Sequence, residues 1–350
     1  MLIARAPFRI SLAGGGTDLP AYYERFGGMV VSTTINRYVY ASITPINSEQ
    51  MSQVTSADYQ TFYRYHSAGP LTWDGDLALP RAVLHEFDAR RGISVFIASE
   101  VPPGTGLGSS SAVAVALIAG VSARLARKMD RNEIARLACG VELQKLGAPI
   151  GKQDQYASAF GGLNALTFTP DEVRVDRLKI QSDVQEQLDR RLLLFFTGTA
   201  RNSAAILREQ RQASEEQSSV TLEGLHRIRE AANSCRRYLA IGDLDAIGTL
   251  LDETWQQKRR LASGITNPRI DEAYSVARRH GALGGKITGA GGGGFLLLYC
   301  REELQDDLTA AMEKQGLRRM DFRFDRDGVT VASVDWDRPV ALRTETGGCL

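Results

Sequence analysis

Cysteine is scarce in this sequence, and no paired-cysteine motif is present. Only 4 of the 350 residues are cysteines, and Cys139, Cys235, Cys300 and Cys349 are far apart. The chain therefore has neither the C-x-x-C pairs of a structural zinc site nor the cysteine density of a small disulfide-stabilised fold. This usage fits a reducing compartment, so we expect a cytoplasmic protein.

Long hydrophobic runs and a surplus of one charge are also missing. No uninterrupted apolar stretch reaches about 18 residues, and the segment MLIARAPFRIS is broken by Arg5 and Arg9. We therefore expect neither a membrane span nor a signal peptide. The 42 Lys and Arg residues balance the 41 Asp and Glu residues to a net charge of +1. This balance argues against nucleic acid or an acidic membrane as a partner.

Two common nucleotide-binding motifs are absent in their required context. Gly289–Gly294 satisfies G-x-G-x-x-G, but it leads into FLLLYC, which we predict to be a buried strand, whereas a Rossmann loop opens a helix. The segment GAPIGKQ is one residue shorter than a P-loop and has Gln153 where Ser or Thr would hold magnesium. The sequence thus predicts neither a Rossmann oxidoreductase nor a P-loop enzyme.

Glycine, by contrast, is concentrated in three stretches: AGGGTD at 13–18, PPGTGLGSSSA at 102–112 and KITGAGGGGF at 286–295. In the second stretch, glycines at alternate positions allow positive φ angles and close approach of the main chain to a ligand. A helix is predicted directly after them, and the free N–H groups and dipole at its start favour a phosphate. The alternative is a buried helix capped by serine after a Gly/Pro turn.

The pattern along the chain predicts an α+β protein with two lobes, a β-rich one over 1–185 and an α+β one over 186–340. Strands are predicted at 2–13, 29–45, 92–102, 163–168, 173–178, 191–198, 295–300, 321–325 and 328–336. Helices are predicted at 109–128, 131–146, 202–261 with a break near Gly242, from Pro268 onward, and at 302–315. Asp130 and Glu133 have the spacing of a capping box.

Two acidic residues are candidates for chemistry. Glu142 lies on the predicted helix 131–146, and Asp154 lies in GKQDQYASAFGG, which we predict to be a loop. If Glu142 and a hydroxyl of the Gly-Ser stretch converge, they supply oxygen ligands of the kind that Mg²⁺ takes together with nucleotide phosphates. Asp154 is then free for an acceptor hydroxyl. The alternatives are a solvated surface residue for Glu142 and a turn-capping aspartate for Asp154.

Together these segments resemble a known family. PPGTGLGSSSA resembles the phosphate loop of the GHMP kinases, which include galactokinase, homoserine kinase, mevalonate kinase and phosphomevalonate kinase. RAPFRISLAGGGTD resembles their first motif and KITGAGGGG their third, in the family order. The resemblance implies an ATP- and Mg²⁺-dependent kinase. It also implies the α+β two-lobe GHMP kinase fold, with an N-terminal lobe like domain 2 of ribosomal protein S5 and a ferredoxin-like C-terminal lobe.

The resemblance also assigns roles to matching positions. It places Mg²⁺ at Ser110 and Glu142, and it matches Asp154 to the aspartate near the acceptor hydroxyl and Arg9 to the basic residue beside it. A cation at Arg9 would stabilise the carboxylate and help to orient the attacking oxygen. Whether Asp154 removes the proton or only positions the hydroxyl stays open. The resemblance places the ATP phosphates on Gly104, Thr105, Gly106, Leu107, Gly108, Ser109, Ser110 and Ser111.

One departure bears on the substrate. Galactokinases have Glu-His where this chain has Gly15-Gly16, which disfavours galactose. AGGGTD, TGTARNSAAIL, SGITNPRIDE and GALGGKITGAGGGGF resemble bacterial D-glycero-D-manno-heptose 7-phosphate kinases. These phosphorylate the anomeric hydroxyl to give the 1,7-bisphosphate, and the resemblance implies a role in activated heptose for capsule, surface-layer or lipopolysaccharide glycans. Substrate contacts are then expected at Gly15, Gly16, Thr17, Asp18, Arg201, Gly289, Ala290 and Gly291.

The resemblance thus implies a sugar-1-kinase that acts on a heptose 7-phosphate. The substrate phosphate needs a cationic clamp, for which Arg201 is the preferred candidate, with Arg25 and Lys258 next. A kinase for free fucose or another hexose, and a non-catalytic sugar or nucleotide sensor, remain as alternatives. The adenine pocket is expected within residues 45–100, where Trp73 is either a base contact or a core residue. A homo-oligomer is left open.

Overall fold

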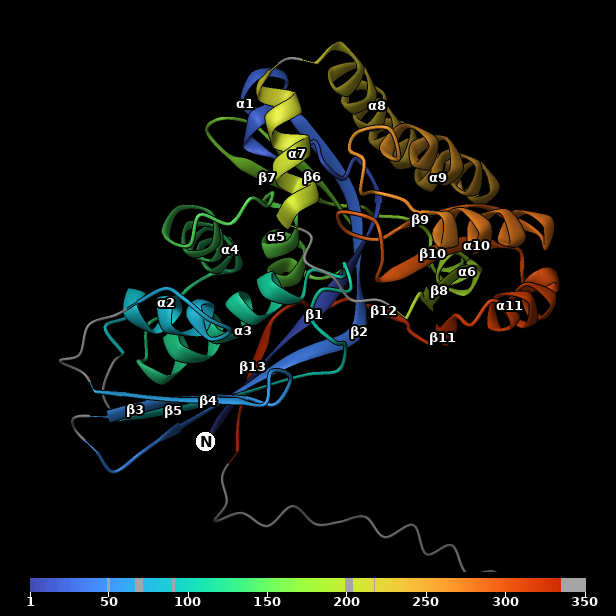
Figure 1. Cartoon of the computed structure of the whole chain (residues 1–350). Helices are drawn as coiled ribbons and strands as arrows, with labels where there is room; N and C mark the ends of the chain where they lie inside the picture. Colours follow the sequence, from blue (N-terminus) through green and yellow to red (C-terminus); the bar gives the residue numbers. More distant parts are fainter. Residues whose placement is uncertain (49–50, 67–71, 90–91, 199–203, 217, 335–350) are drawn as a thin grey trace, which may run out of the picture.

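The structure is a computed structural model that describes residues 1–48, 51–66, 72–89, 92–198, 204–216 and 218–334. It contains a large sheet and a smaller sheet, both flanked by helices (Figure 1). The large sheet consists of β1 (Leu2–Ala13), β2 (Gly28–Pro45), β3 (Met51–Ser56), β4 (Thr61–His66), β5 (Ile93–Ser99), β6 (Asn164–Phe168), β7 (Val173–Arg177), β12 (Phe324–Asp325) and β13 (Thr330–Ser333).

The long strands β1 and β2 form the centre of the large sheet. They pair antiparallel, with Leu2 opposite Ile43 and Ala13 opposite Val31, and the path of the sheet runs β13-β1-β2-β5-β3-β4. Their β-branched and aromatic residues favour this extended pairing. Helices α1 (Pro20–Phe26), α2 (Ala78–Glu86), α3 (Ser109–Arg124), α4 (Arg131–Cys139) and α5 (Gln153–Phe160), with the π-helix η1 (Gly140–Lys145), belong to the same half of the chain. Helix α3 packs on β1 and β2.

The smaller sheet is antiparallel in the order β11-β8-β10-β9. It consists of β8 (Leu192–Phe196), β9 (Ala282–Ile287), β10 (Phe295–Cys300) and β11 (Arg318–Met320). Its helices are α6 (Ser182–Arg191), α7 (Ala204–Glu215), α8 (Ser219–Ile241), α9 (Leu244–Lys258), α10 (Pro268–Arg279) and α11 (Gln305–Lys314), with the 3-10 turn η2 (Glu302–Leu304). Helices follow β8 and separate β10 from β11, and this β-α-β-β-α-β order is ferredoxin-like, as the resemblance implies.

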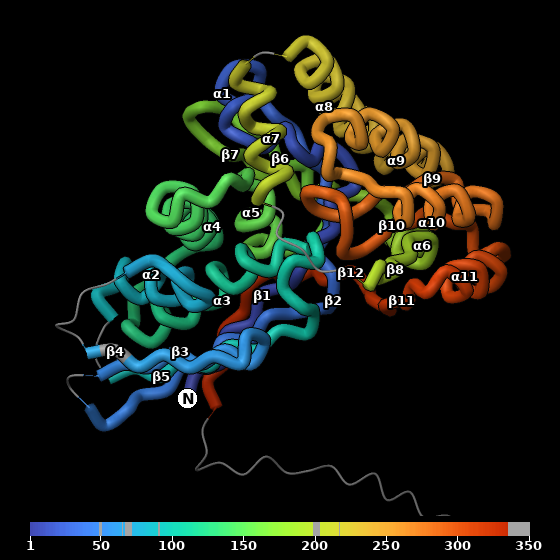
Figure 2. The backbone as a smooth tube through the Cα atoms, in the orientation of Figure 1, coloured from blue at the N-terminus to red at the C-terminus, as the bar shows by residue number. Residues whose placement is uncertain are grey.

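After the smaller sheet is complete, the chain returns to the large one. β12 pairs with β2, and β13 pairs with β1, so the first and last strands of the large sheet lie side by side (Figure 2). The predicted C-terminal segment 186–340 therefore contributes two strands to the sheet of the N-terminal segment. The lobe boundary near residue 185 stays a prediction.

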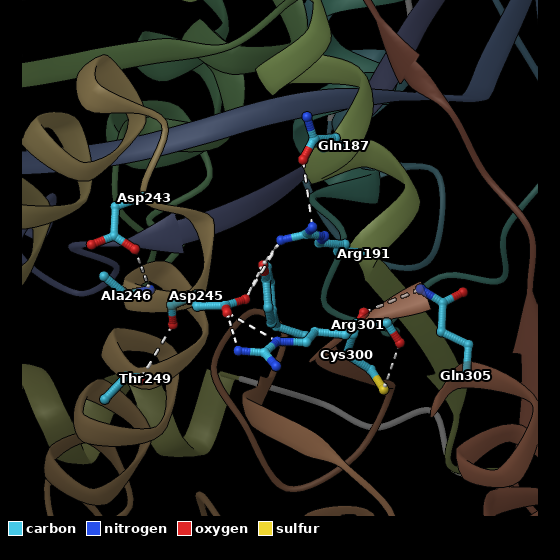
Figure 3. Close-up of polar contacts among 10 residues, drawn as sticks. Gln187, Arg191, Asp243, Asp245, Ala246, Thr249, Cys300, Arg301 and Gln305 are labelled. Atoms are coloured by element: carbon cyan, nitrogen blue, oxygen red, sulfur yellow. Dashed lines mark hydrogen bonds and ion pairs between the residues drawn. The ribbon is translucent and has the colours of Figure 1, made fainter. Parts of the chain in front are cut away.

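A polar cluster joins the smaller sheet to α6 and α9 (Figure 3). Asp245, in the first turn of α9, accepts hydrogen bonds from Arg301 Nε at 2.9 Å and from the hydroxyl of Tyr299 at 3.0 Å. Arg191, the last residue of α6, donates to the same tyrosine hydroxyl at 3.0 Å. Hydrogen bonding from Arg301 holds the pKa of Asp245 below its usual value, although partial burial opposes this.

Most of the long elements agree with the sequence predictions. The capping box is formed, because Asp130 Oδ1 accepts from Glu133 N at 2.8 Å and Glu133 Oε2 accepts from Asp130 N at 2.7 Å. The break at Gly242 is confirmed, with a left-handed φ of 76°. The predicted helix 202–261 contains a second break that was missed, since α7 ends at Glu215 and α8 begins at Ser219.

One prediction near the site is confirmed with a change of helix type, and another was wrong. The helix predicted over 131–146 changes to a π-helix at Gly140, and that turn carries Glu142. Asp154 lies in the first turn of α5 rather than in a loop. Asp18, which is distant in sequence, accepts a hydrogen bond from the N–H of Gln153 at 3.2 Å and so supports the start of this short helix. That contact is tertiary, so the local sequence could not indicate it.

Two further observations concern the sequence predictions on compartment. Cys139, Cys235 and Cys300 are buried free thiols, while Cys349 lies outside the described residues. Within the described ranges, none of the helices combines the length and the apolar character that crossing a membrane requires.

Candidate active site

A cavity of about 520 Å³ lies where the three glycine-rich stretches meet. Gly15 and Gly16, which follow β1, form part of its wall. The loop before α3 contributes Gly104, Gly106 and Gly108, and the first turn of α3 contributes Ser109, Ser110 and Ser111. The turn between β9 and β10 contributes Gly289 and Ala290. Segments from both sheets therefore build one cavity.

Only glycine permits the contact between the second and third stretches. A Cβ added to Gly289 would lie 2.6 Å from the Cα of Gly106, and one added to Gly106 would lie 2.5 Å from the carbonyl oxygen of Thr288. Both glycines have positive φ angles, 65° and 84°. The two loops thus pack main chain against main chain, which explains why side chains are excluded there.

Helix α3 points its uncapped start at the cavity. Its N-cap is Gly108, with a left-handed φ of 81° and no side-chain cap, while the hydroxyls of Ser110 and Ser111 donate to Glu142. The alternative of a serine-capped helix is therefore wrong. The first N–H groups and the helix dipole favour an anion at this position.

Alternate residues of the predicted phosphate loop line the cavity. Thr105 and Leu107 do not; both are fully buried. The carbonyl of Thr105 accepts from the N–H of Phe295 at 3.2 Å, and that of Leu107 accepts from the N–H of Arg9 at 3.1 Å. These two residues fasten the loop to both sheets. The lining positions are Gly104, Gly106, Gly108, Ser109, Ser110 and Ser111.

Arg9, on β1, forms a bidentate ion pair with Asp154. Arg9 Nε donates to Oδ1 at 2.7 Å and Nη2 donates to Oδ2 at 2.8 Å, while Nη1 donates to the carbonyl of Gly106 at 2.7 Å. A Cβ on Gly108 would lie 3.1 Å from Asp154 Oδ2, so this carboxylate lies beside the start of α3. A hydroxyl bound at Asp154 is therefore adjacent to an anion bound at the helix.

Glu142 has the environment expected of a metal ligand. It is 1% exposed, and its oxygens accept from Ser110, from Ser111 at 2.8 Å and from Gln155 at 2.6 Å. Burial raises the pKa of Glu142 to about 7, and these hydrogen bonds oppose the rise only in part. The hydrogen-bond partners that the structure describes for it are all uncharged, so a cation beside Ser110 would supply the missing counter-charge.

The protein alone does not build a complete metal cage at this point. The described parts of the chain hold no cluster of three or more His, Cys, Asp or Glu residues that could bind a metal ion. A magnesium ion at Ser110 and Glu142 would therefore take most of its ligands from phosphate and water, as Mg²⁺ does in nucleotide sites. The oxygen donors present fit such an ion.

The predicted first-motif residues divide into two groups. Gly15, Gly16 and Asp18 lie on the cavity wall. Asp18 is 3% exposed and accepts a hydrogen bond from the N–H of Gly16 at 3.0 Å. Its pKa is raised mainly by burial and in addition by the negative charge of Asp154. Thr17 is fully buried, does not line the cavity, and donates to the carbonyl of Gly14 at 2.8 Å. It therefore shapes the loop rather than facing a ligand.

The third stretch divides in the same way. Gly289 and Ala290 line the cavity, but Gly291 does not. A Cβ on Gly291 would lie 2.7 Å from the side chain of Ile265, so this glycine allows close packing of the turn.

Two lysines line the cavity. Lys286 of β9 is 4% exposed and donates to the carbonyl of Leu12 at 3.2 Å, and Lys258 of α9 donates to the carbonyl of Gly289. Burial, with the nearby charges of Lys258 and Arg9, lowers the pKa of Lys286 well below its usual value. Sequence reasoning assigned no role to Lys286, although it is the first residue of the third glycine stretch.

Of the other two predicted clamp residues, Arg25 is described and does not line this cavity. Arg201 lies outside the described residues. Arg25, in the last turn of α1, lies over the ring of Phe26 with its guanidinium carbon 5.2 Å from the ring centroid, and it is absent from the cavity lining. Among the described candidates, Lys258 is the one that the cavity retains.

A further part of the cavity is lined by residues from within 56–59, 75–80 and 97–103, which include Tyr59, Leu77, Leu79 and Ile97. Sequence reasoning placed the adenine pocket in this region without identifying these residues. Trp73 does not line the cavity; its ring meets His85 edge-on at 5.4 Å and packs against the core.

Comparison with known proteins agrees with this geometry. The model of the GHMP kinases N terminal domain matches residues 78–162, and that of the GHMP kinases C terminal domain matches residues 228–317. The D-glycero-alpha-D-manno-heptose 7-phosphate kinase of Campylobacter jejuni is 30% identical over 332 residues, which are 93% of this chain and 97% of that protein. The chain belongs to the GHMP kinase family.

Solved structures show the same fold for this GHMP kinase. A D-glycero-D-manno-heptose 1-phosphate kinase from Bacteroides thetaiotaomicron matches with a TM-score of 0.79 and 28% identity, over 96% of this chain and 100% of that one. Lactococcus lactis galactokinase complexed with galactose matches with a TM-score of 0.75 at 16% identity, over 95% of both chains, which supports the fold alone. The protein is an ATP-dependent sugar kinase of the GHMP family, and the sensor alternative is set aside.

Proposed function

We propose that this kinase transfers the γ-phosphoryl group of ATP to the anomeric hydroxyl of D-glycero-D-manno-heptose 7-phosphate. The product is the 1,7-bisphosphate, which would serve nucleotide-activated heptose and surface glycan synthesis. The observation that carries the proposal is the match to the Campylobacter jejuni enzyme named for this sugar phosphate, over 97% of its length. Lys258 on the cavity wall supports an acceptor that carries its own phosphate.

In this proposal the ATP phosphates bind at the start of α3, against the lining residues of the 104–111 loop. Ser110 and Glu142 hold Mg²⁺, which neutralises charge on the phosphates when it is bound. The adenine base takes the end of the cavity near Tyr59 and Leu79.

Asp154 receives the hydrogen bond of the acceptor hydroxyl, and Arg9 fixes the direction of the carboxylate through its two donated hydrogen bonds. Both a proton-accepting role and a positioning role require this placement, because each needs an oxygen within hydrogen-bond reach of the attacking hydroxyl.

The test is a coupled ADP-release assay with heptose 7-phosphate, free heptose, fucose and galactose, followed by identification of the phosphorylated carbon. Free heptose lacks the 7-phosphate and therefore cannot form the charge-assisted hydrogen bond to it, which is worth roughly 1.5 to 3 kcal/mol. We therefore expect kcat/KM for free heptose to be about ten- to a hundredfold lower than kcat/KM for heptose 7-phosphate. A preference for free fucose would replace the heptose phosphate proposal with the fucokinase alternative.

The position of the clamp is tested separately. Arg201→Ala should raise KM for heptose 7-phosphate and leave ATP binding unchanged. If that variant behaves as wild type while Lys258→Gln raises this KM, the clamp belongs to Lys258 and the substrate assignment stands.

A further inference from the structure

Three buried polar atoms on the cavity wall have no hydrogen-bond partner within the described part of the chain. They are Ser11 Oγ, Gln153 Oε1 and Gln210 Nε2. Ser11 is 7% exposed and Gln210 is 3% exposed. A buried donor or acceptor without a partner is costly, so a group that completes it is expected.

These atoms come from three separate elements but gather around the same two glycines. A Cβ on Gly16 would lie 2.7 Å from Gln210 Nε2, and one on Gly15 would lie 3.3 Å from Ser11 Oγ and 3.8 Å from Gln153 Nε2. Because neither position carries a side chain, the wall is left open beside the polar groups. Asp154 directly follows Gln153 in the first turn of α5, and both residues line the same cavity as Ser11 and Gln210.

The hydrogen-bonding role of Gln153 is fixed by Asp18. Gln153 Nε2 donates to Asp18 Oδ1 at 3.0 Å, and the main-chain N–H donates to Oδ2 at 3.2 Å. A carboxylate accepts and cannot donate, so the NH₂ group must face Asp18 and the oxygen must face away from it. Gln153 therefore offers the cavity an acceptor.

The side chain of Gln210 lies against the opposite side of the glycine pair. Gln210 belongs to α7, which lies beside α1 (Figure 1). Its main-chain carbonyl accepts from Ser214 Oγ at 2.9 Å, and its side chain lines the cavity. The amide Nε2 offers a donor, and the hydroxyl of Ser11 can donate and accept.

We propose that Ser11, Gln153 and Gln210 form the subsite that recognises the non-reacting hydroxyl groups of the acceptor sugar. The inference deepens the proposed function and rests on it. Neighbouring sugar hydroxyls each donate and accept, which matches one acceptor, one donor and one group that does both. An acceptor without those hydroxyls leaves the three buried groups unpaired, and sites of this kind reject such analogues strongly.

The decisive variant is Gln210→Leu, which removes the donor and keeps a side chain of similar size. We expect KM for heptose 7-phosphate to rise about tenfold, with KM for ATP and the Mg²⁺ dependence unchanged. The Tm of the ligand-free enzyme should not fall, because leucine replaces a donor that has no partner among the described residues. Ser11→Ala should raise the same KM in the same way.

The matched control is Gln212→Leu, on the same helix. Gln212 is exposed and its Nε2 donates to Glu216 at 2.8 Å, away from the cavity, so KM for the sugar should stay at the wild-type value. Deoxy analogues of the sugar sharpen the assignment. For the analogue that lacks the hydroxyl bound by Gln210, the wild type should show a higher KM than for heptose 7-phosphate, whereas Gln210→Leu should show similar KM values for the two.

The outcomes separate the subsite from the proposed function. If the wild type prefers heptose 7-phosphate and both variants retain its KM, the subsite inference is overturned and the function stands. A fall in Tm without a change in KM assigns the residues to folding and also overturns it. If the wild type prefers another sugar, the function fails, and the same KM measurements on that sugar decide the subsite.

Discussion

Replacing Asp154 by asparagine tests whether this aspartate takes part in the reaction or only completes an ion pair. Arg9 donates to both of its oxygens, at 2.7 and 2.8 Å. Asparagine keeps one acceptor and turns an N–H group toward the guanidinium. Arg9, which is 4% exposed, then loses a charge-assisted hydrogen bond and its counter-charge.

The structure gives separate magnitudes for stability and for turnover. Removing one partner of a buried pair costs about 3–5 kcal/mol, but Asp154 is 22% exposed and Arg9 keeps its bond to Gly106. We therefore expect a loss of about 2 kcal/mol, which lowers Tm by about 3 °C for a chain of 350 residues. Loss of a base or of positioning lowers kcat by about 10² to 10⁴-fold.

The double variant Asp154→Asn with Arg9→Met separates these effects. Removing both partners of a buried pair is close to neutral for stability, so Tm should return toward the wild-type value while kcat stays low. Calorimetric unfolding and the ADP-release assay measure the two quantities, and ATP binding by titration calorimetry should be retained in Asp154→Asn. A kcat within about threefold of wild type in that variant, or recovery of kcat together with Tm in the double variant, would refute the role of Asp154.

Two further substitutions test the metal site and the polar cluster of α9. Glu142→Gln should raise the Mg²⁺ concentration for half-maximal activity at least about tenfold, because an amide is a poorer ligand for a hard cation. Glu133→Gln on α4 is the control. An unchanged magnesium titration in Glu142→Gln would leave Glu142 with a structural role. Asp245→Asn should destabilise the protein by about 0.5–1 kcal/mol at pH 7, a value reduced for solvent screening because the side chain is 35% exposed. The pKa of Asp245 is lowered in the folded state, so its stabilisation is present above the unfolded-state pKa and is lost as the pH falls through the folded one. Urea unfolding should therefore show a difference in stability between variant and wild type at pH 7 that shrinks as the pH falls below the unfolded-state pKa, and a difference that does not change with pH would contradict the assignment.

Local sequence was sufficient for the parts of the site that are contiguous along the chain. Glycines at alternate positions before an apolar helix predicted the loop that lines the cavity, and all three of them line it with positive φ angles. The same reasoning holds for the capping box at Asp130 and for the strand after Gly294, because propensity and turn chemistry act over a few residues.

The parts that depend on tertiary contacts were not predictable in this way. The start of α5 is supported by Asp18, and the buried Glu142 is stabilised by donors from α3 and α5. The π-helical turn at Gly140 has no local signal that separates it from the preceding helix. The sequence assigned no site role to Lys286, because only the fold places it against Lys258 and Arg9.

Strand β1 explains how the two halves of the chain share one site. Arg9 binds Gly106 and Asp154 from the large sheet, and three residues later the carbonyl of Leu12 accepts from Lys286 of the smaller sheet at 3.2 Å. The backbone contact between Gly106 and Gly289 reinforces this connection. Relative movement of the sheets would break these contacts together, so we infer that the phosphate loop and the acceptor side of the cavity keep a fixed separation before substrates bind. Catalysis by positioning requires that arrangement.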